Sequence, residues 1–289
     1  MTYRFLTSRL LAVAIVGFAY AGAAGAAPKA AGSMDPQQVE TIRQAIAESR
    51  LLDAGRMIDE AGAAGVADPR LRILSGELGL ARKRFPEALG DFKAAEASAD
   101  PQVRGEALQG HGLALISMER HDAAFPLLQQ AVAAAPQNWR AWNALGSLYD
   151  RKRDWSSAEA AYSKALDASG QHASVLNNRG YSRMLQGRLA DAKADFVAAL
   201  QKRPDLAEAR NNLRLTLALE GDYDRAVAGA RLGEEAALLN NAGFAAAARG
   251  DYVTAEQLLQ QAMKARGEFY ARASGNLKLI QTEAPASPR

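Results

Sequence analysis

The chain contains no cysteine, and this absence excludes several kinds of protein and site. Without thiols there is no disulfide, no thiolate nucleophile and no thiolate metal ligand. Attachment of a lipid at the end of a signal peptide also requires cysteine, so the chain is not expected to be a lipoprotein. The stretch that follows Ala26 is long enough to be stabilised by a buried core alone.

Histidine is scarce, and no catalytic motif is present. The three histidines, His111, His121 and His172, have no HExxH spacing, so each is interpreted as an isolated helical or turn residue and no metal is expected. There is no GxSxG, phosphate loop or dinucleotide fingerprint. We therefore expect no catalytic residue and no cofactor, and predict that the chain is not an enzyme.

Charge of either sign is not in excess, and β-branched residues are few. The 35 basic residues face 32 acidic ones, and this near-balance gives no reason to expect a nucleic-acid partner. The alanine-rich, strand-poor composition favours helix.

The segment 1–26 has the pattern of a secretory signal peptide. Arg4 and Arg9 precede an uncharged run from Leu10 through Ala24, and Ala24-Gly25-Ala26 is a small-residue cleavage pattern. We expect cleavage near Ala26 and no integral membrane span afterwards. An uncleaved anchor is the alternative, but the run is short for a bilayer, which needs about 20 apolar residues.

A small residue recurs at a nearly fixed interval through the rest of the chain. Gly76, Gly112, Gly146 and Gly180 are separated by 36, 34 and 34 residues. A period near 34 is typical of stacked helix–turn–helix units. Alanines follow the same interval, at Ala88, Ala124, Ala158, Ala192 and Ala226. A non-repeating helical bundle does not explain this spacing, so the pattern predicts an all-α solenoid.

Residues 139–172 form the clearest unit. They read Trp142, Leu145, Gly146 and Tyr149 on one helix, then Ala158, Tyr162 and Ala165 on a second. The pattern resembles the tetratricopeptide repeat, W-x2-L-G-x2-Y followed by A-x3-F-x2-A, with Gly170 in place of the closing proline. Large side chains are expected beside small ones where the two helices meet. The resemblance implies a right-handed superhelix whose first helices line a concave groove.

The repeats predict the following division of the chain. Residues 1–26 are the signal peptide, 27–34 a flexible lead-in, 35–282 one tetratricopeptide-repeat solenoid and 283–289 a disordered tail. The expected units are 35–68, 69–104, 105–138, 139–172, 173–206, 207–235 and 236–269, with a capping helix at 270–282 that includes Ala273, Leu277 and Ile280, and with Phe269 just before it.

The unit at 207–235 departs from the pattern. It carries Arg214 where the small residue belongs, and the next alanine of the series, Ala255, follows Ala226 sooner than the repeat interval requires, so the unit is shortened. Its second helix, expected from Tyr223 to Leu232, includes Gly229 and Gly233 and is predicted to be the least stable of the set.

Asparagine recurs at one place in four consecutive units, and this series is the candidate binding site. Asparagine both donates and accepts hydrogen bonds, so it can pair with a peptide backbone whatever its side chains. Bracing of the backbone between repeats is an equally weighted alternative. Tyr181 and Phe244 directly follow glycines of the repeat series and are candidate apolar anchors, or else core residues. The expected groove residues are Asn143, Asn177, Asn178, Tyr181, Asn211, Asn212, Asn240, Asn241 and Phe244.

The last third of the chain resembles a more specific family. The segments LNNRGYSRMLQG at 176–187, ARNNLRLTLALEG at 209–221 and LNNAGFAAAARGDY at 239–252 look like the TadD family of Flp/Tad pilus assembly proteins. The resemblance implies a periplasmic, non-enzymatic scaffold that binds proteins or extended peptides in its groove. Members of that family are commonly lipoproteins, and this chain lacks the cysteine. Alternatives are a generic periplasmic repeat protein of another envelope complex, an accessory subunit of an enzyme, or a structural spacer.

Overall fold

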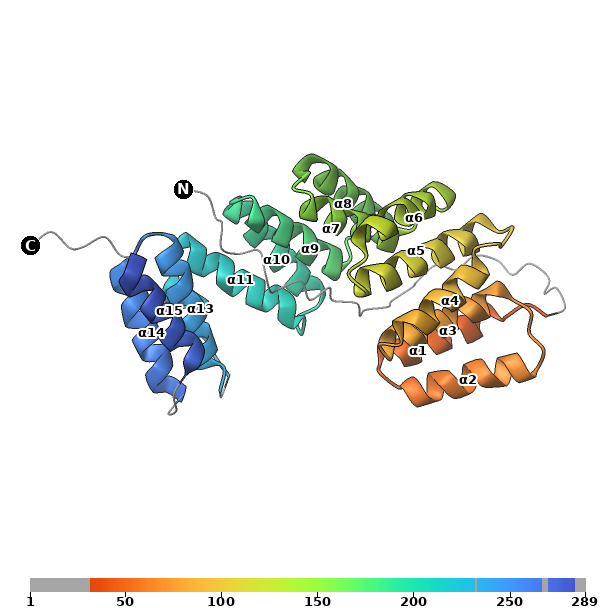
Figure 1. Ribbon diagram of the computed structural model, residues 1–289, viewed down its shortest axis with the longest axis horizontal. Coiled ribbons are helices and arrows are strands. Elements are labelled where there is room, and N and C mark those ends of the chain that lie inside the picture. The colour runs from red at the N-terminus through yellow and green to blue at the C-terminus, as the bar shows by residue number, and fades with distance from the viewer. Residues whose placement is uncertain (1–31, 232, 267–269, 284–289) are drawn as a thin grey trace, which may run out of the picture. The chain divides into compact units, whose positions relative to one another are not determined.

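The structure, a computed structural model, describes residues 32–231, 233–266 and 270–283. Within these ranges the chain forms fifteen α-helices and no strand, as the sequence predicts (Figure 1). The chain divides into two compact units at Val175 and Leu176, inside helix α9 (Ala173–Leu185). The signal peptide, most of the lead-in, Leu232, Phe269 and all but the first residue of the tail lie outside the described residues.

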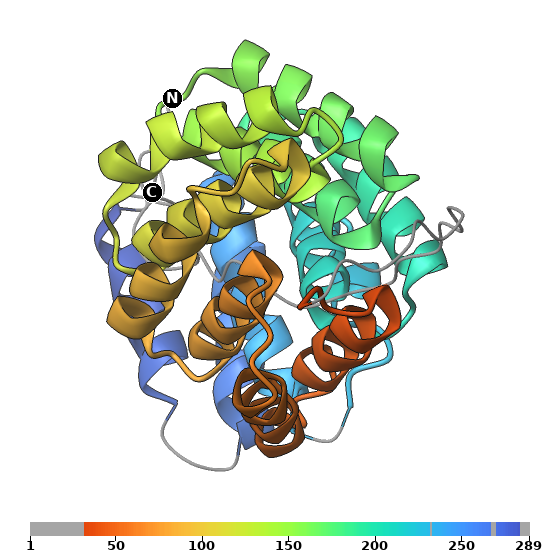
Figure 2. The same ribbon diagram turned by 90° about the vertical axis from the view of Figure 1, so that its right-hand side faces the viewer.

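The N-terminal unit is built from four helical hairpins. The first helices of these hairpins, α1, α3, α5 and α7, pack on one another in order, and α2, α4 and α6 each lie between two successive first helices (Figures 1 and 2). The helices are α1 (Pro36–Ala47), α2 (Leu51–Ala63), α3 (Pro69–Ala81), α4 (Phe85–Ala95), α5 (Pro101–Ser117), α6 (His121–Ala134), α7 (Trp139–Arg151) and α8 (Trp155–Ser169).

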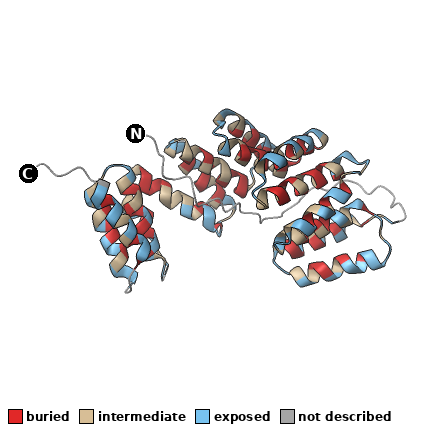
Figure 3. Ribbon diagram, viewed as in Figure 1, coloured by how far each residue is buried: buried red, intermediate tan, exposed pale blue. Residues whose placement is uncertain are grey.

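The C-terminal unit is also built from packed helical hairpins. Helix α11 packs on α10 and α13, and α15 covers both α13 and α14, as expected of a cap. The helices are α10 (Leu189–Lys202), α11 (Ala207–Glu220), α12 (Tyr223–Val227), α13 (Glu235–Ala248), α14 (Tyr252–Arg266) and α15 (Ala271–Glu283). Figure 3 shows buried residues along the helix sides that meet and exposed ones on the outside.

Five hairpins close where a glycine of the first helix meets a large side chain of the second. A Cβ built at Gly146 would lie 2.6 Å from the Tyr162 ring, and one at Gly180 would lie 2.8 Å from the Phe196 ring. These separations are shorter than carbon atoms tolerate, so only glycine fits. The expected packing of large against small residues is therefore confirmed. The other pairs are Gly76 with Phe92, Gly112 with Leu128 and Gly243 with Leu259.

The turn inside each hairpin has a residue in the left-handed region, and this position keeps the repeat interval. Glycine occupies it in later hairpins, as at Gly187 with φ 77°. Earlier hairpins use residues that rarely adopt this conformation: Ser49, Lys83, Glu119 and Arg153 have φ of 57–60°. The turn geometry is thus set by the stacking of the helices, even where the sequence does not favour it.

The shortened unit has a second helix of only five residues. Helix α12 ends at Val227, so the expected helix through residue 232 is wrong beyond that point. Gly229, with φ 63°, and Gly233, with φ 84°, take left-handed conformations that end and redirect the helix. Arg214, on α11, donates hydrogen bonds to the carbonyls of Ala228 (3.0 Å) and Gly229 (3.2 Å). An arginine therefore fills the place of the missing turn of helix.

The described end of the lead-in is ordered by the first hairpins. Met34 is 1% exposed and belongs to the core of α1, α2 and α3. Its backbone N–H donates to Asp68 Oδ2 at 2.8 Å, and Asp68 also caps α3. The fold thus begins at Met34 rather than after it.

The glycine contacts predict a contrast between two helical glycines. We expect Gly180→Leu to overpack the buried Phe196 ring and lower the free energy of unfolding by about 1–3 kcal/mol or more. Gly90→Leu, on α4, is the matched control, because nothing lies within 4 Å of a Cβ at that position. Chemical denaturation followed by circular dichroism measures both, and equal midpoints would contradict the assigned packing.

Candidate functional site

The predicted asparagine series divides into buried braces and exposed groups. Asn177 is 6% exposed and accepts a hydrogen bond from Asn212 Nδ2 at 2.9 Å, between α9 and α11. Asn240 is 7% exposed and accepts from Asn276 Nδ2 at 3.0 Å, between α13 and α15. These four carboxamides tie successive first helices together, which is the bracing alternative that the sequence left open.

Two further predicted residues lie next to the braces. Asn178 Oδ1 accepts from Asn177 Nδ2 at 3.2 Å, and Asn241 Oδ1 accepts from Asn240 Nδ2 at 3.4 Å. Asn178 and Asn143 are half-buried, whereas Asn241 is exposed. In the pairs Asn177-Asn178 and Asn240-Asn241 the first asparagine is buried in the brace and the second is closer to solvent. In the third pair the order is reversed: Asn212 joins the brace and Asn211 is exposed.

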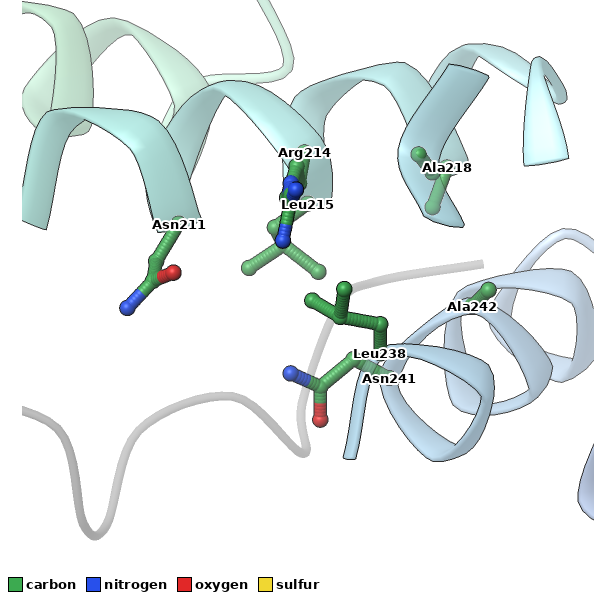
Figure 4. A pocket seen from close by; sticks show the side chains of 8 residues that line it. Asn211, Arg214, Leu215, Ala218, Leu238, Asn241 and Ala242 are labelled. Carbon is green, nitrogen blue, oxygen red and sulfur yellow. The ribbon is translucent and has the colours of Figure 1, made fainter. Parts of the chain in front are cut away.

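Asn211 and Asn241 are exposed on facing helices, α11 and α13, beside a small cleft (Figure 4). The cleft has a volume of about 20 Å³, far smaller than the roughly 300–1,000 Å³ typical of small-molecule pockets. We call it the α11–α13 notch, and it is lined by Asn211, Arg214, Leu215, Ala218, Ala226, Leu238, Asn241 and Ala242.

The two candidate aromatic anchors are mainly packing residues. Tyr181 and Phe244 are half-buried, and Tyr181 contacts the hydrophobic core of the C-terminal unit. Part of each ring reaches solvent, but neither protrudes as an isolated apolar side chain.

The N-terminal unit holds a cluster of charges that the sequence analysis did not identify. Arg43, on α1, is 3.2 Å from Glu77 on α3 and 2.6 Å from Glu106 on α5. The three side chains are only 14–22% exposed. Arg43 thus joins three successive first helices.

Burial and ion pairing act in opposite directions on the charges of this cluster. It raises the pKa of the Glu77 carboxyl above its ordinary value, although Arg43 and Arg140 act in the opposite direction. Burial alone would lower the pKa of Arg43, but the attraction of Glu77 and Glu106 outweighs it and the pKa is raised. Glu77 also attracts Arg140, whose pKa burial lowers.

One signal in the sequence could have revealed the cluster. Arg43 and Glu77 are one full repeat apart in the sequence, as are Glu106 and Arg140, so each pair occupies equivalent positions of neighbouring units. Residues one repeat apart lie side by side in a solenoid. Arg43 and Glu106, however, belong to hairpins that are not consecutive in the sequence, and no fixed spacing predicts their contact.

Two aromatic rings extend this part of the N-terminal unit. Trp139 stacks on His172 with ring centroids 4.5 Å apart, and the Arg140 guanidinium lies 4.7 Å from the Trp139 centroid. His172 Nδ1 also accepts from the Ser174 backbone N–H at 3.3 Å, at the start of α9. His172 is thus a turn residue, as expected, but it is not isolated, because it contacts both Trp139 and Ser174.

The remaining histidines lie in separate surroundings. His111 Nδ1 is 2.5 Å from Glu96 Oε1. Burial lowers the pKa of His121, and Arg151 lowers it further, which favours the neutral ring at neutral pH. In the part of the chain that the structure describes, no three His, Cys, Asp or Glu side chains are grouped to hold a metal ion. None of the helices described there has the length and apolar character needed to cross a bilayer.

Comparison with known proteins places the fold. Residues 110–173, from α5 to the start of α9, match the family model described as tetratricopeptide repeat. No curated protein matches the chain. The chain is therefore similar to tetratricopeptide-repeat proteins over this segment of sequence.

Solved structures extend the likeness beyond that segment. The TPR protein TTC0263 of Thermus thermophilus is 19% identical with a TM-score of 0.55, covering 63% of this chain and 97% of that one. PilF of Pseudomonas aeruginosa is 18% identical with a TM-score of 0.56, covering 74% and 97%. YrrB, described as a TPR protein with an unusual peptide-binding site, is 20% identical with a TM-score of 0.50, covering 65% and 97%. At such identities the likeness is one of fold, and the fold is a tetratricopeptide-repeat α-solenoid.

The charge cluster predicts a large penalty for losing its cation. We expect Arg43→Met to lower the free energy of unfolding by about 3–5 kcal/mol at neutral pH, because Glu77 and Glu106 would lose the guanidinium that contacts both of them. The loss should shrink as the pH falls through the raised pKa of Glu77, since protonation of that carboxyl removes a buried charge.

Two variants control this experiment, which is followed by urea denaturation across pH. Arg56→Met breaks an ion pair whose side chains are both 62% exposed and should change stability by at most about 1 kcal/mol. Adding Glu77→Gln and Glu106→Gln to Arg43→Met should recover much of the loss. A pH-independent loss, or one no larger than that of Arg56→Met, would refute the role of the cluster.

Arg214 should stabilise the shortened hairpin more than its exposed neighbour does. We expect Arg214→Ala to cost about 1.5–3 kcal/mol locally, because it removes charged hydrogen bonds to two carbonyls. Arg225→Ala is the control, since that side chain is 69% exposed and bonds only to Asp222 one turn away. Amide hydrogen exchange of residues 223–231 is the measurement. Equal acceleration in both variants would show that Arg214 does not replace the missing helix.

Proposed function

We propose that this chain is a non-enzymatic, exported scaffold that holds partner proteins along its first helices, in Flp/Tad-type pilus assembly. The observation that carries the proposal is the regular stacking of first helices. Within each unit these helices form one continuous layer, and successive repeats present side chains at equivalent positions of that layer. Such surfaces suit extended polypeptides better than small molecules. The nine predicted groove residues remain the candidate contacts, with Asn211 and Asn241 the most accessible of the asparagines.

Three kinds of observation support the parts of this proposal. The tetratricopeptide-repeat fold supports the role in holding proteins, since its stacked first helices present side chains at equivalent positions of successive repeats. The signal-peptide pattern of segment 1–26 supports export and a periplasmic location. The resemblance of residues 176–252 to the TadD family supports the pilus role, and the missing cysteine favours a form without lipid.

Export can be tested separately from binding. The chain is expected in the osmotic-shock fraction of the source bacterium, beginning at or within two residues of Ala27. Edman sequencing or mass spectrometry of the purified protein identifies that residue. A chain that keeps residues 1–26 and stays with membranes would instead support the uncleaved anchor.

The pilus role is tested by deletion of the gene and site-specific cross-linking. Deletion should abolish Flp pili on the cell surface, and the wild-type gene should restore them. A photoreactive phenylalanine analogue at residue 244 should cross-link to a pilus component such as the secretin. The same analogue at Val253, which is 71% exposed on α14, is the control.

Other outcomes separate the alternatives. Normal piliation after deletion, with cross-linking to another envelope complex, would leave the scaffold role and remove the pilus role. Cross-linking that is equal at residues 244 and 253 would count against binding along the first helices.

A further inference from the structure

The shortened hairpin changes how two first helices meet. In the described N-terminal unit, a second helix of at least eleven residues lies between successive first helices. Helix α12 has five residues and contributes one buried residue, Ala226. Helices α11 and α13 pack on each other, as successive first helices also do in the N-terminal unit, and the α11–α13 notch lies between them beside the short α12.

The floor of the notch is apolar and small. Leu215 and Leu238 approach from opposite helices, and alanines complete the lining (Figure 4). The space open to the centre of a water-sized sphere is about 20 Å³, slightly more than the roughly 10–15 Å³ that one water needs. A methyl group fits this space, whereas an aromatic ring does not. An apolar floor also favours such a group over water.

The rim of the notch is polar but uncharged. Asn211 and Asn241 stand on either side, both exposed. Within the described residues, nothing hydrogen-bonds the Asn211 carboxamide, and Asn241 keeps its amino group for a ligand while its oxygen accepts from Asn240. Two carboxamides on facing helices can donate to and accept from the main chain of a peptide that crosses between them.

The one cation that lines the notch is already engaged. Arg214 donates to the carbonyls of Ala228 and Gly229, and Glu234 lies 3.8 Å from its guanidinium. Its side chain is 14% exposed. A charged group of a ligand would therefore lose water without gaining an unneutralised partner, which disfavours its entry.

We propose that the α11–α13 notch is a docking site for an extended, uncharged peptide segment that places one alanine-sized side chain between Leu215 and Leu238. Its main chain pairs with Asn211 and Asn241. This inference rests on the proposed scaffold role and names the part of the first helices that selects a partner, as well as the chemistry that it selects.

The test is a titration of the mature chain, isotopically labelled for NMR, with blocked pentapeptides at millimolar concentration. The probe is acetyl-Ser-Thr-Ala-Thr-Ser-amide, together with versions that carry Val, Asp, Lys or Trp at the centre. We expect saturable shifts of the Asn211 and Asn241 side-chain amides and of amides near Leu215 and Leu238. The Ala peptide should bind at least about five-fold more tightly than the others, because burial of a charge or of an oversized side chain is unfavourable.

Two variants locate the binding. Asn241→Ala should weaken association about 2- to 10-fold, the effect of one hydrogen bond. Gln257→Ala, on α14 and outside the lining of the notch, should leave it unchanged. The proposal is overturned if no resonance at the notch shifts, if shifts concentrate elsewhere, or if the Val, Asp, Lys or Trp peptide binds as well as the Ala peptide.

Failure of this inference is distinguishable from failure of the proposed function. Loss of pili on deletion, together with cross-linking at residue 244 but no peptide binding at the notch, would keep the scaffold and remove the notch. Peptide binding at the notch in a chain that is dispensable for pili would keep the notch and remove the pilus role.

Discussion

The closeness with which the two helices of each hairpin meet is the constraint on which the rest of the structure depends. At Gly146 and Gly180 the first helix approaches an aromatic ring so closely that a methyl group would collide with it. This contact fixes the distance between the helices, and the buried alanines of the second helices, such as Ala158, allow it to continue along the hairpin. Only with that distance fixed do the first helices lie near enough for Asn177 to meet Asn212 and for Arg43 to reach Glu106.

The features that the sequence predicted are those formed within one repeat. Gly180 and Phe196 belong to the same hairpin, and the same spacing separates Gly146 from Tyr162, so repetition alone identifies them. Gly229 and Gly233 likewise indicated a weak second helix, because each favours ending a helix locally. What local patterns could not give was the length of α12, which depends on how Arg214 satisfies the carbonyls that follow it.

The features that the sequence did not predict depend on contacts between repeats. An asparagine donates and accepts equally well toward a ligand or toward another asparagine, so residue type could not separate the exposed Asn241 from the buried Asn240. The contact of Arg43 with Glu106 depends on how closely α1 approaches α5 across α3. The left-handed turns at Lys83 and Glu119 could not be predicted, because neither residue favours that conformation. At Gly187 the same turn has the residue type that favours it.

The two units place different chemistry on their first helices. In the N-terminal unit, Arg43 and the glutamates that it contacts neutralise one another, and a ligand would have to replace ion pairs that are already formed. In the C-terminal unit, buried asparagine pairs brace the helices without charge, and exposed carboxamides remain beside a small apolar cleft. Displacing a buried ion pair leaves charges unpaired at a cost of several kcal/mol, whereas an exposed carboxamide only exchanges water for peptide. The ion-paired hairpins of the N-terminal unit thus follow from the regular repeat. The neutral, accessible notch follows from the shortened hairpin.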